Sequence, residues 1–76
     1  MKNFRLCNQD LENWYEAKFH NAIDVVRAIK SKGFTTFEIE WLTPVTKKYT
    51  TLIKVENGVK VFENENFKLP KVFKKF

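Results

Sequence analysis

Two glutamates in this chain have a spacing that could support acid–base chemistry. Glu38 and Glu40 are separated by one residue, so in an extended strand their carboxylates would lie about 6.5–7 Å apart on one face. Such a spacing resembles the carboxylate pair of a general acid–base site. No nucleophile, oxyanion donor or metal ligand accompanies them in the sequence. A solvated outer face, with an ion pair to Lys54 of a neighbouring strand, is therefore the favoured interpretation.

Cys7 and His20 are the other residues that could act in catalysis, as a thiolate and its base. The chain has one cysteine and one histidine, and nothing in the sequence brings them together. We expect a small buried cysteine and a surface histidine ahead of a helix. A single cysteine also forms no intramolecular disulfide, which fits a reducing compartment and predicts a cytoplasmic protein. The sequence thus predicts no enzyme, no metal and no cofactor.

The strongest chemical signal is a cationic, aromatic C-terminal segment, residues 67–76. It holds four lysines and no acid, which accounts for +4 of the net charge of +5, and the other 66 residues are nearly neutral. The lysines alternate with rings and aliphatic side chains, as in surfaces that hold phosphates and stack bases. An acidic protein could equally bind here. The alternative is that Phe67, Leu69 or Phe73 packs on the core while the lysines keep the segment soluble.

A membrane role is disfavoured for this segment, because Pro70 interrupts any amphipathic helix. Lys47 and Lys48, in a connector after Thr46, could lie at the same end of the sheet as the C-terminal lysines and extend the cationic edge. The alternative is that they are two solvated loop lysines. An exposed Trp14 would add an interface anchor. The predicted partner-binding residues are Trp14, Lys47, Lys48, Lys68, Lys71, Phe73, Lys74, Lys75 and Phe76.

Local signals place most of the elements that must position these residues. Apolar residues at helical spacing predict a helix over about 22–32, with Asn21 as its N-cap and Gly33 just after its end. Residues 34–42 alternate as a half-buried strand, with Trp41 on the core side. Asn57-Gly58 predicts a tight hairpin between 49–56 and 59–62. With a two-residue loop, Ile53 should lie opposite Phe62.

The first twenty residues allow two interpretations. Tyr15, Ala17 and Phe19 alternate with polar neighbours, as in a strand that pairs with a strand around Phe4 and Leu6. Apolar residues from position 11 to 29 also fit one long helix that begins at Asp10. His20 and Asn21, both weak helix formers, would then lie in its middle, which favours the strand.

Both interpretations predict an α+β fold, and with the strands it is β-β-α-β-β-β. One helix packs on an antiparallel sheet of three to five strands, in a single domain over 1–66, followed by a basic tail over 67–76. The length suits one small core, and no apolar run is long enough to span a membrane. A monomer or small homo-oligomer is expected.

In its layout, the chain resembles small phage-encoded inhibitors of the anti-CRISPR type. The resemblance covers residues 4–63 as architecture: the strand-like Trp14–Phe19, the helix from Asn21 to Lys30 and the meander through Glu56-Asn-Gly58. It implies a non-enzymatic protein that docks on a host protein or ribonucleoprotein, such as a defence effector. A direct nucleic-acid-binding module is the alternative, with lysines on phosphates and Phe73 or Phe76 on bases.

Overall fold

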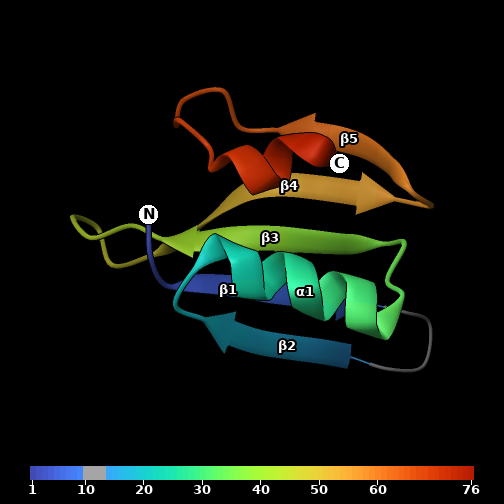
Figure 1. Cartoon of the computed structure of the whole chain (residues 1–76). Coiled ribbons are helices and arrows are strands. Elements are labelled where there is room, and N and C mark those ends of the chain that lie inside the picture. The colour runs from blue at the N-terminus through green and yellow to red at the C-terminus, as the bar shows by residue number, and fades with distance from the viewer. Residues whose placement is uncertain (10–13) are drawn as a thin grey trace.

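The chain folds as one open antiparallel sheet in the strand order β2-β1-β3-β4-β5, with two helices on one side (Figure 1). The computed structural model describes residues 1–9 and 14–76. The predicted α+β fold and its β-β-α-β-β-β order are confirmed. The elements are β1 (Phe4–Gln9), β2 (Trp14–Phe19), α1 (Ala22–Lys32), β3 (Phe37–Leu42), β4 (Tyr49–Glu56), β5 (Val59–Glu63) and the 3₁₀ helix η1 (Lys71–Lys75).

Helix α1 begins and ends where its capping residues predict. The Asn21 side chain accepts a hydrogen bond of 2.9 Å from the Asp24 N–H, which satisfies a backbone donor left free in the first turn. Gly33 has a φ of 69° and donates its N–H to the Ile29 carbonyl at 2.9 Å. Val25 and Ile29 are the buried residues of this helix. The helix therefore presents one narrow apolar side to the sheet.

The strand interpretation of the first twenty residues is confirmed, and the long helix from Asp10 is wrong. β1 and β2 are antiparallel, with Phe4 opposite Phe19 and Leu6 opposite Ala17. Asp10 itself lies outside the described residues. Alternation along β2 turns Tyr15, Ala17 and Phe19 to one face of the sheet. The period-two pattern of the sequence therefore predicted this segment correctly, and the helical spacing did not.

The β4–β5 hairpin has the predicted turn but a different register. Asn57 and Gly58 have φ values of 52° and 79°, and Glu56 lies opposite Val59, as a two-residue turn requires. A bulge then inserts Val61, so Ile53 lies opposite Glu63 and the predicted pairing of Ile53 with Phe62 is wrong. Phe62 instead lies opposite Lys54 and is 43% exposed.

The core lies between the sheet and its two helices, and residues of the C-terminal segment belong to it. Leu69 and Phe73 are buried with Phe4, Leu6 and the other core residues. Residues 67–76, expected as a tail beside a domain of residues 1–66, are thus packed against the rest of the chain.

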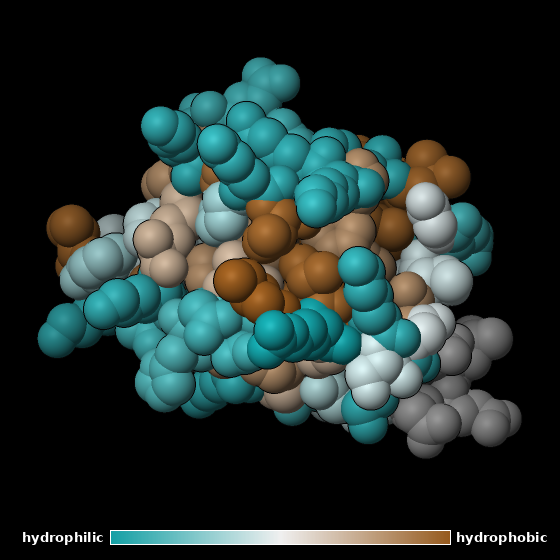
Figure 2. All heavy atoms as spheres, viewed as in Figure 1, coloured by the Kyte–Doolittle hydropathy of each residue, from teal (hydrophilic) through white to brown (hydrophobic). Residues whose placement is uncertain are grey.

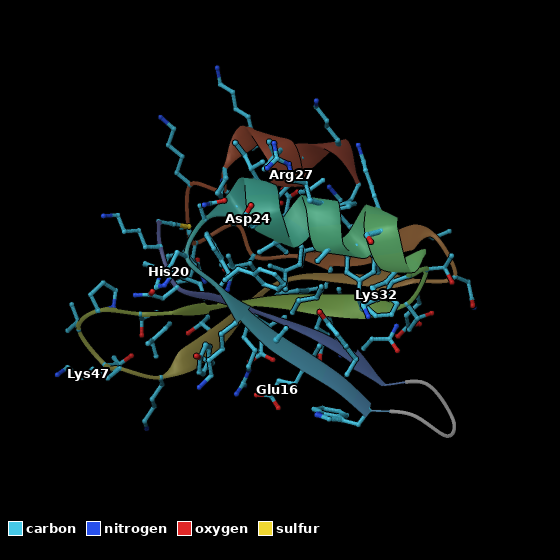
Figure 3. The ribbon with its side chains drawn as sticks, turned by 60° about the horizontal axis from the view of Figure 1, so that its bottom comes forward. Glu16, His20, Asp24, Arg27, Lys32 and Lys47 are labelled. Carbon is cyan, nitrogen blue, oxygen red and sulfur yellow. The ribbon has the colours of Figure 1, made fainter. Side chains whose placement is uncertain are left out.

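The sheet has two unlike faces. The face covered by α1 and η1 is called the helical face below, and the uncovered one is called the open face. Figure 3 shows Asp24 and Arg27 on the helical side and Glu16 on the opposite side of the sheet. Strand alternation and register place these side chains on the open face: Arg5, Cys7, Trp14, Glu16, Lys18, Glu38, Glu40, Tyr49, Lys54, Glu56 and Phe62.

Candidate functional site: a basic groove on the helical face

Aromatic contacts hold the C-terminal segment on the sheet. Phe73 is fully buried and meets the Phe4 ring edge-on, with ring centroids 5.2 Å apart. Phe67 packs on Trp41 and Phe76 packs on Phe37, each with ring centroids 5.2 Å apart. Pairs of this geometry add about 0.5–1.5 kcal/mol each beyond the area that they bury. The rings thus fix the position of the lysines between them.

The lysines of this segment face solvent because the rings face inward. Lys68, Lys71, Lys74 and Lys75 are all exposed. Among the ion pairs of residues 1–9 and 14–76, none involves these four lysines. The pKa of Glu63 is lowered mainly by the hydrogen bond from Lys60, and the positive charge of nearby Lys74 lowers it further. The segment therefore presents four lysines from backbone positions that the packed rings hold.

A groove runs between α1 and the C-terminal segment. One end is lined by Met1, Asn21, Ala22, Ile23, Lys68, Leu69, Pro70, Lys71 and Val72, and the other by Ile23, Val26, Arg27, Lys30, Val72, Lys75 and Phe76. Ile23 and Val72 line both hollows, so the two lie next to each other along α1. In Figure 2 apolar side chains gather between two hydrophilic bands, over the space between α1 and η1.

Apolar residues line this groove and basic residues flank it. Ile23 is 53% exposed, and Val26, Val72 and Phe76 are half-buried beside it. Arg27 and Lys30 project from α1, and Lys68, Lys71 and Lys75 lie on the opposite side. Asp24 is the one acid of α1, and it lies 3.8 Å from Arg27 in an exposed pair. The groove therefore combines an apolar surface with positive charge on both sides.

The nine predicted partner-binding residues fall in three places rather than on one edge. The six between Lys68 and Phe76 lie in the C-terminal segment. Lys47 and Lys48 are exposed in the β3–β4 connector, and Figure 3 shows Lys47 at its tip, away from the C-terminal segment. Trp14 is 60% exposed but lies on the open face. The expected convergence of the two lysine groups is therefore not seen.

Two of the predicted contact residues are turned inward. Phe73 is 0% exposed, so it has no free ring face for a base, and Phe76 is half-buried against Phe37. Conversely, Ile23, Arg27 and Lys30 of α1 contribute to the groove and were not predicted to do so. Ile23 could have indicated that α1 takes part in the groove, because it is apolar but lies outside the core-facing positions of the helix.

On the open face, most of the charged residues form ion pairs with one another. The Arg5 guanidinium contacts Glu40 at 2.6 Å and Glu16 at 3.3 Å, and it lies 3.9 Å above the Tyr49 ring. The contact with Glu40 raises the pKa of Arg5. Glu38 pairs with Lys54 at 3.4 Å, as the outer-face interpretation of the two glutamates expects.

Cys7 is buried within this network and is chemically quiet. Its thiol donates to Glu40 at 3.3 Å, and burial together with that contact raises the pKa of Cys7 to about 12. A thiol with such a pKa is protonated at neutral pH and is a poor nucleophile. His20 is exposed and lies beyond the Phe4 end of β1, away from Cys7. The geometry thus provides no thiolate–imidazole pair in the described chain.

The described residues contain neither a metal-binding cluster nor a membrane-spanning helix. Residues 1–9 and 14–76 contain no group of three or more His, Cys, Asp or Glu side chains arranged to hold a metal ion. Within the same residues, no helix has the length and hydropathy to cross a membrane. No protein-family model, curated protein or solved structure matches the chain.

Proposed function

We propose that this protein is a small non-enzymatic binding protein that docks through its helical face on an acidic surface of a partner protein or ribonucleoprotein. The observation that carries the proposal is the set of Lys68, Lys71, Lys74 and Lys75 on a docked segment, exposed and outside every ion pair of the described residues. Positive charge of this kind accelerates association with acidic partners and selects among them.

The proposed partner is a complex of a bacterial host, such as a defence effector, which the protein would inhibit by occupying a binding surface. This part of the proposal rests on the resemblance in layout to anti-CRISPR inhibitors that the sequence suggests. Many of those inhibitors are acidic and imitate DNA, whereas this chain carries a net charge of +5. Docking on an acidic or nucleic-acid-bearing surface suits that charge better than imitation of DNA does.

Affinity capture from bacterial lysate tests the proposal. The immobilised chain is compared with the quadruple variant Lys68→Gln, Lys71→Gln, Lys74→Gln and Lys75→Gln. The matched control changes four exposed lysines elsewhere: Lys2→Gln, Lys18→Gln, Lys47→Gln and Lys48→Gln. We expect the native chain and the control to retain the same acidic protein or ribonucleoprotein, and the quadruple variant to lose it. If all three retain the same proteins, the C-terminal lysines are not the binding surface.

Direct binding of nucleic acid is the second candidate, and the same lysines support it. Each phosphate contact would release counterions, so the affinity would fall steeply with salt. Burial of Phe73 weakens this candidate, because it removes the ring that was to stack on a base. Titration of random single- and double-stranded DNA and RNA at several salt concentrations decides the matter. Tight binding with a steep salt slope, lost in the quadruple variant, would favour it over a protein partner.

A further inference from the structure

The groove between α1 and the C-terminal segment has the surface chemistry of a helix-binding site. We infer that it receives an acidic amphipathic helix of the partner, with apolar side chains against Ile23, Val26 and Val72 and carboxylates facing the lysines on either side. This inference rests on the proposed function and specifies the partner's binding segment. Three features of the groove lead to it.

The first feature is the apolar surface that lies open between two charged borders. Ile23 is 53% exposed, whereas Val25, two residues further along the same helix, is fully buried. Together with Val26, Val72 and Phe76, it forms a patch rather than a scattered single residue. Patches of this kind, bordered by polar residues, mark interaction sites. A surface that bound its partner through charge alone would not need an exposed apolar patch.

The second feature is that basic residues flank the patch on both sides. Arg27 and Lys30 lie along α1, while Lys71 and Lys75 lie along η1. A ligand that fits must place apolar groups centrally and negative charge on both flanks. A helix with apolar residues at i, i+3, i+4 and i+7 and glutamates on its two sides has that pattern.

The third feature is that the groove does not lie on an edge of the sheet. The apolar patch lies between α1 and η1, whereas the edge strands of the sheet are β2 and β5. A partner strand therefore cannot extend the sheet here, which favours recognition through side chains. A flat anionic membrane is also a poor fit, because the apolar groups lie in a hollow between the charged side chains instead of projecting past them.

The size of the groove sets the length of the ligand. Eleven residues of α1 extend about 16 Å at 1.5 Å per residue. A bound helix lying along α1 would contact it through about three turns, with three or four apolar anchors. A peptide of about 14 residues is therefore sufficient as a probe.

Two synthetic 14-residue peptides of identical Leu, Glu and Ala composition test the inference. One has its leucines at i, i+3, i+4, i+7 and i+11, and the other has the same residues scrambled. We expect the amphipathic peptide to bind at least about tenfold more tightly, and to shift the NMR signals of Ile23, Val26 and Val72. Equal affinity of the two peptides, or shifts confined to the open face, would overturn the inference.

The variant Ile23→Gln, matched by Val59→Gln on β5, separates this inference from the proposed function. Both residues are mostly exposed, at 53% and 63%, so both variants should fold. We expect Ile23→Gln to lower affinity for the amphipathic peptide to that of the scrambled one, and to lose the captured partner, while Val59→Gln keeps both. A partner that needs the C-terminal lysines but not Ile23 would overturn the helix groove and leave the proposed function intact.

Two further probes distinguish other ligands. Vesicles of phosphatidylglycerol and phosphatidylcholine, and a random single-stranded DNA, are titrated against the same variants. Binding of either that depends on Ile23 and displaces the amphipathic peptide would assign the groove to a membrane or a nucleic acid, and would overturn the inference. Binding of either that is unaffected by Ile23→Gln leaves the peptide result to stand.

Discussion

The two faces of the sheet use the same kinds of charged residue in opposite ways. On the open face, Arg5 is held by Glu40 and Glu16, and Lys54 by Glu38, so the charges neutralise one another. On the helical face, the lysines of the C-terminal segment form none of the ion pairs of the described chain, although Lys74 lies near Glu63. Paired charges stabilise a fold or leave it unchanged, whereas fixed unpaired ones are available to a ligand. The comparison therefore supports a structural role for the paired charges of the open face and is consistent with the proposed binding role of the helical face.

The largest expected effect comes from the ring that anchors the helical face. Phe73→Ala removes a fully buried side chain from the core and should lower the free energy of unfolding by about 3–5 kcal/mol. Phe62→Ala is the matched control on the open face, where the ring is 43% exposed, and should cost about 1 kcal/mol or less. Urea denaturation measures both. Equal losses would mean that the two faces do not differ in packing.

Removal of Arg5 should break the charge network of the open face. Arg5→Met leaves Glu40, whose side chain is 13% exposed, without its cation and should cost about 2 kcal/mol. The control is Arg27→Met on the helical face, where the pair with Asp24 is exposed, with an expected loss of about 0.5 kcal/mol or less. Thermal unfolding at neutral pH compares them. A neutral Arg5→Met variant would show that the network contributes nothing to stability.

The buried thiol of the open face should make the protein sensitive to alkali. The pKa of Cys7 is raised from 9.0 to about 12, so above pH 9 the unfolded chain loses a proton that the folded chain keeps. Stability is therefore full below pH 9 and falls as the pH rises toward 12. Relative to Cys7→Ala, the native chain should lose about 1 kcal/mol between pH 9 and pH 10. A difference between the two that does not change with pH would contradict this.

The smallest expected effect concerns a pair beside the C-terminal segment. The Lys60 hydrogen bond, aided by Lys74, holds the pKa of Glu63 below its ordinary value. The stability from this pair is present above the ordinary carboxyl pKa and is lost as the pH falls through the lowered one. Lys60→Met should raise the pKa of Glu63 toward the ordinary value, and Lys74→Met should raise it less. NMR titration of the Glu63 carboxyl measures both, and the reverse order would contradict the assignment.

Sequence patterns predicted the elements that local chemistry determines. The caps of α1 at Asn21 and Gly33, the Asn57-Gly58 turn and the alternation of β2 each depend on a few neighbouring residues. The register of β5 was missed because Val61 forms a bulge that no local pattern announces. The residue types on either side of a bulge are ordinary strand residues.

The candidate site was only half predicted, since it depends on contacts between distant segments. The lysines of 67–76 could be found by their charge. Their cooperation with α1 follows from packing of Phe73 on Phe4 and Phe76 on Phe37, which are far apart in sequence. Lys47 and Lys48 were grouped with them because strand ends were expected to converge, but the β3–β4 connector carries Lys47 away from the C-terminal segment (Figure 3).

The two tryptophans give each face its own optical reporter. Trp14 is mostly exposed on the open face, where its indole N–H donates to Glu16, whereas Trp41 is half-buried under Phe67 of the C-terminal segment. In a Trp14→Phe background, tryptophan fluorescence would come from Trp41, whose environment changes when residues 67–76 undock. The native side chains thus allow motion on one side of the sheet to be timed without an attached dye.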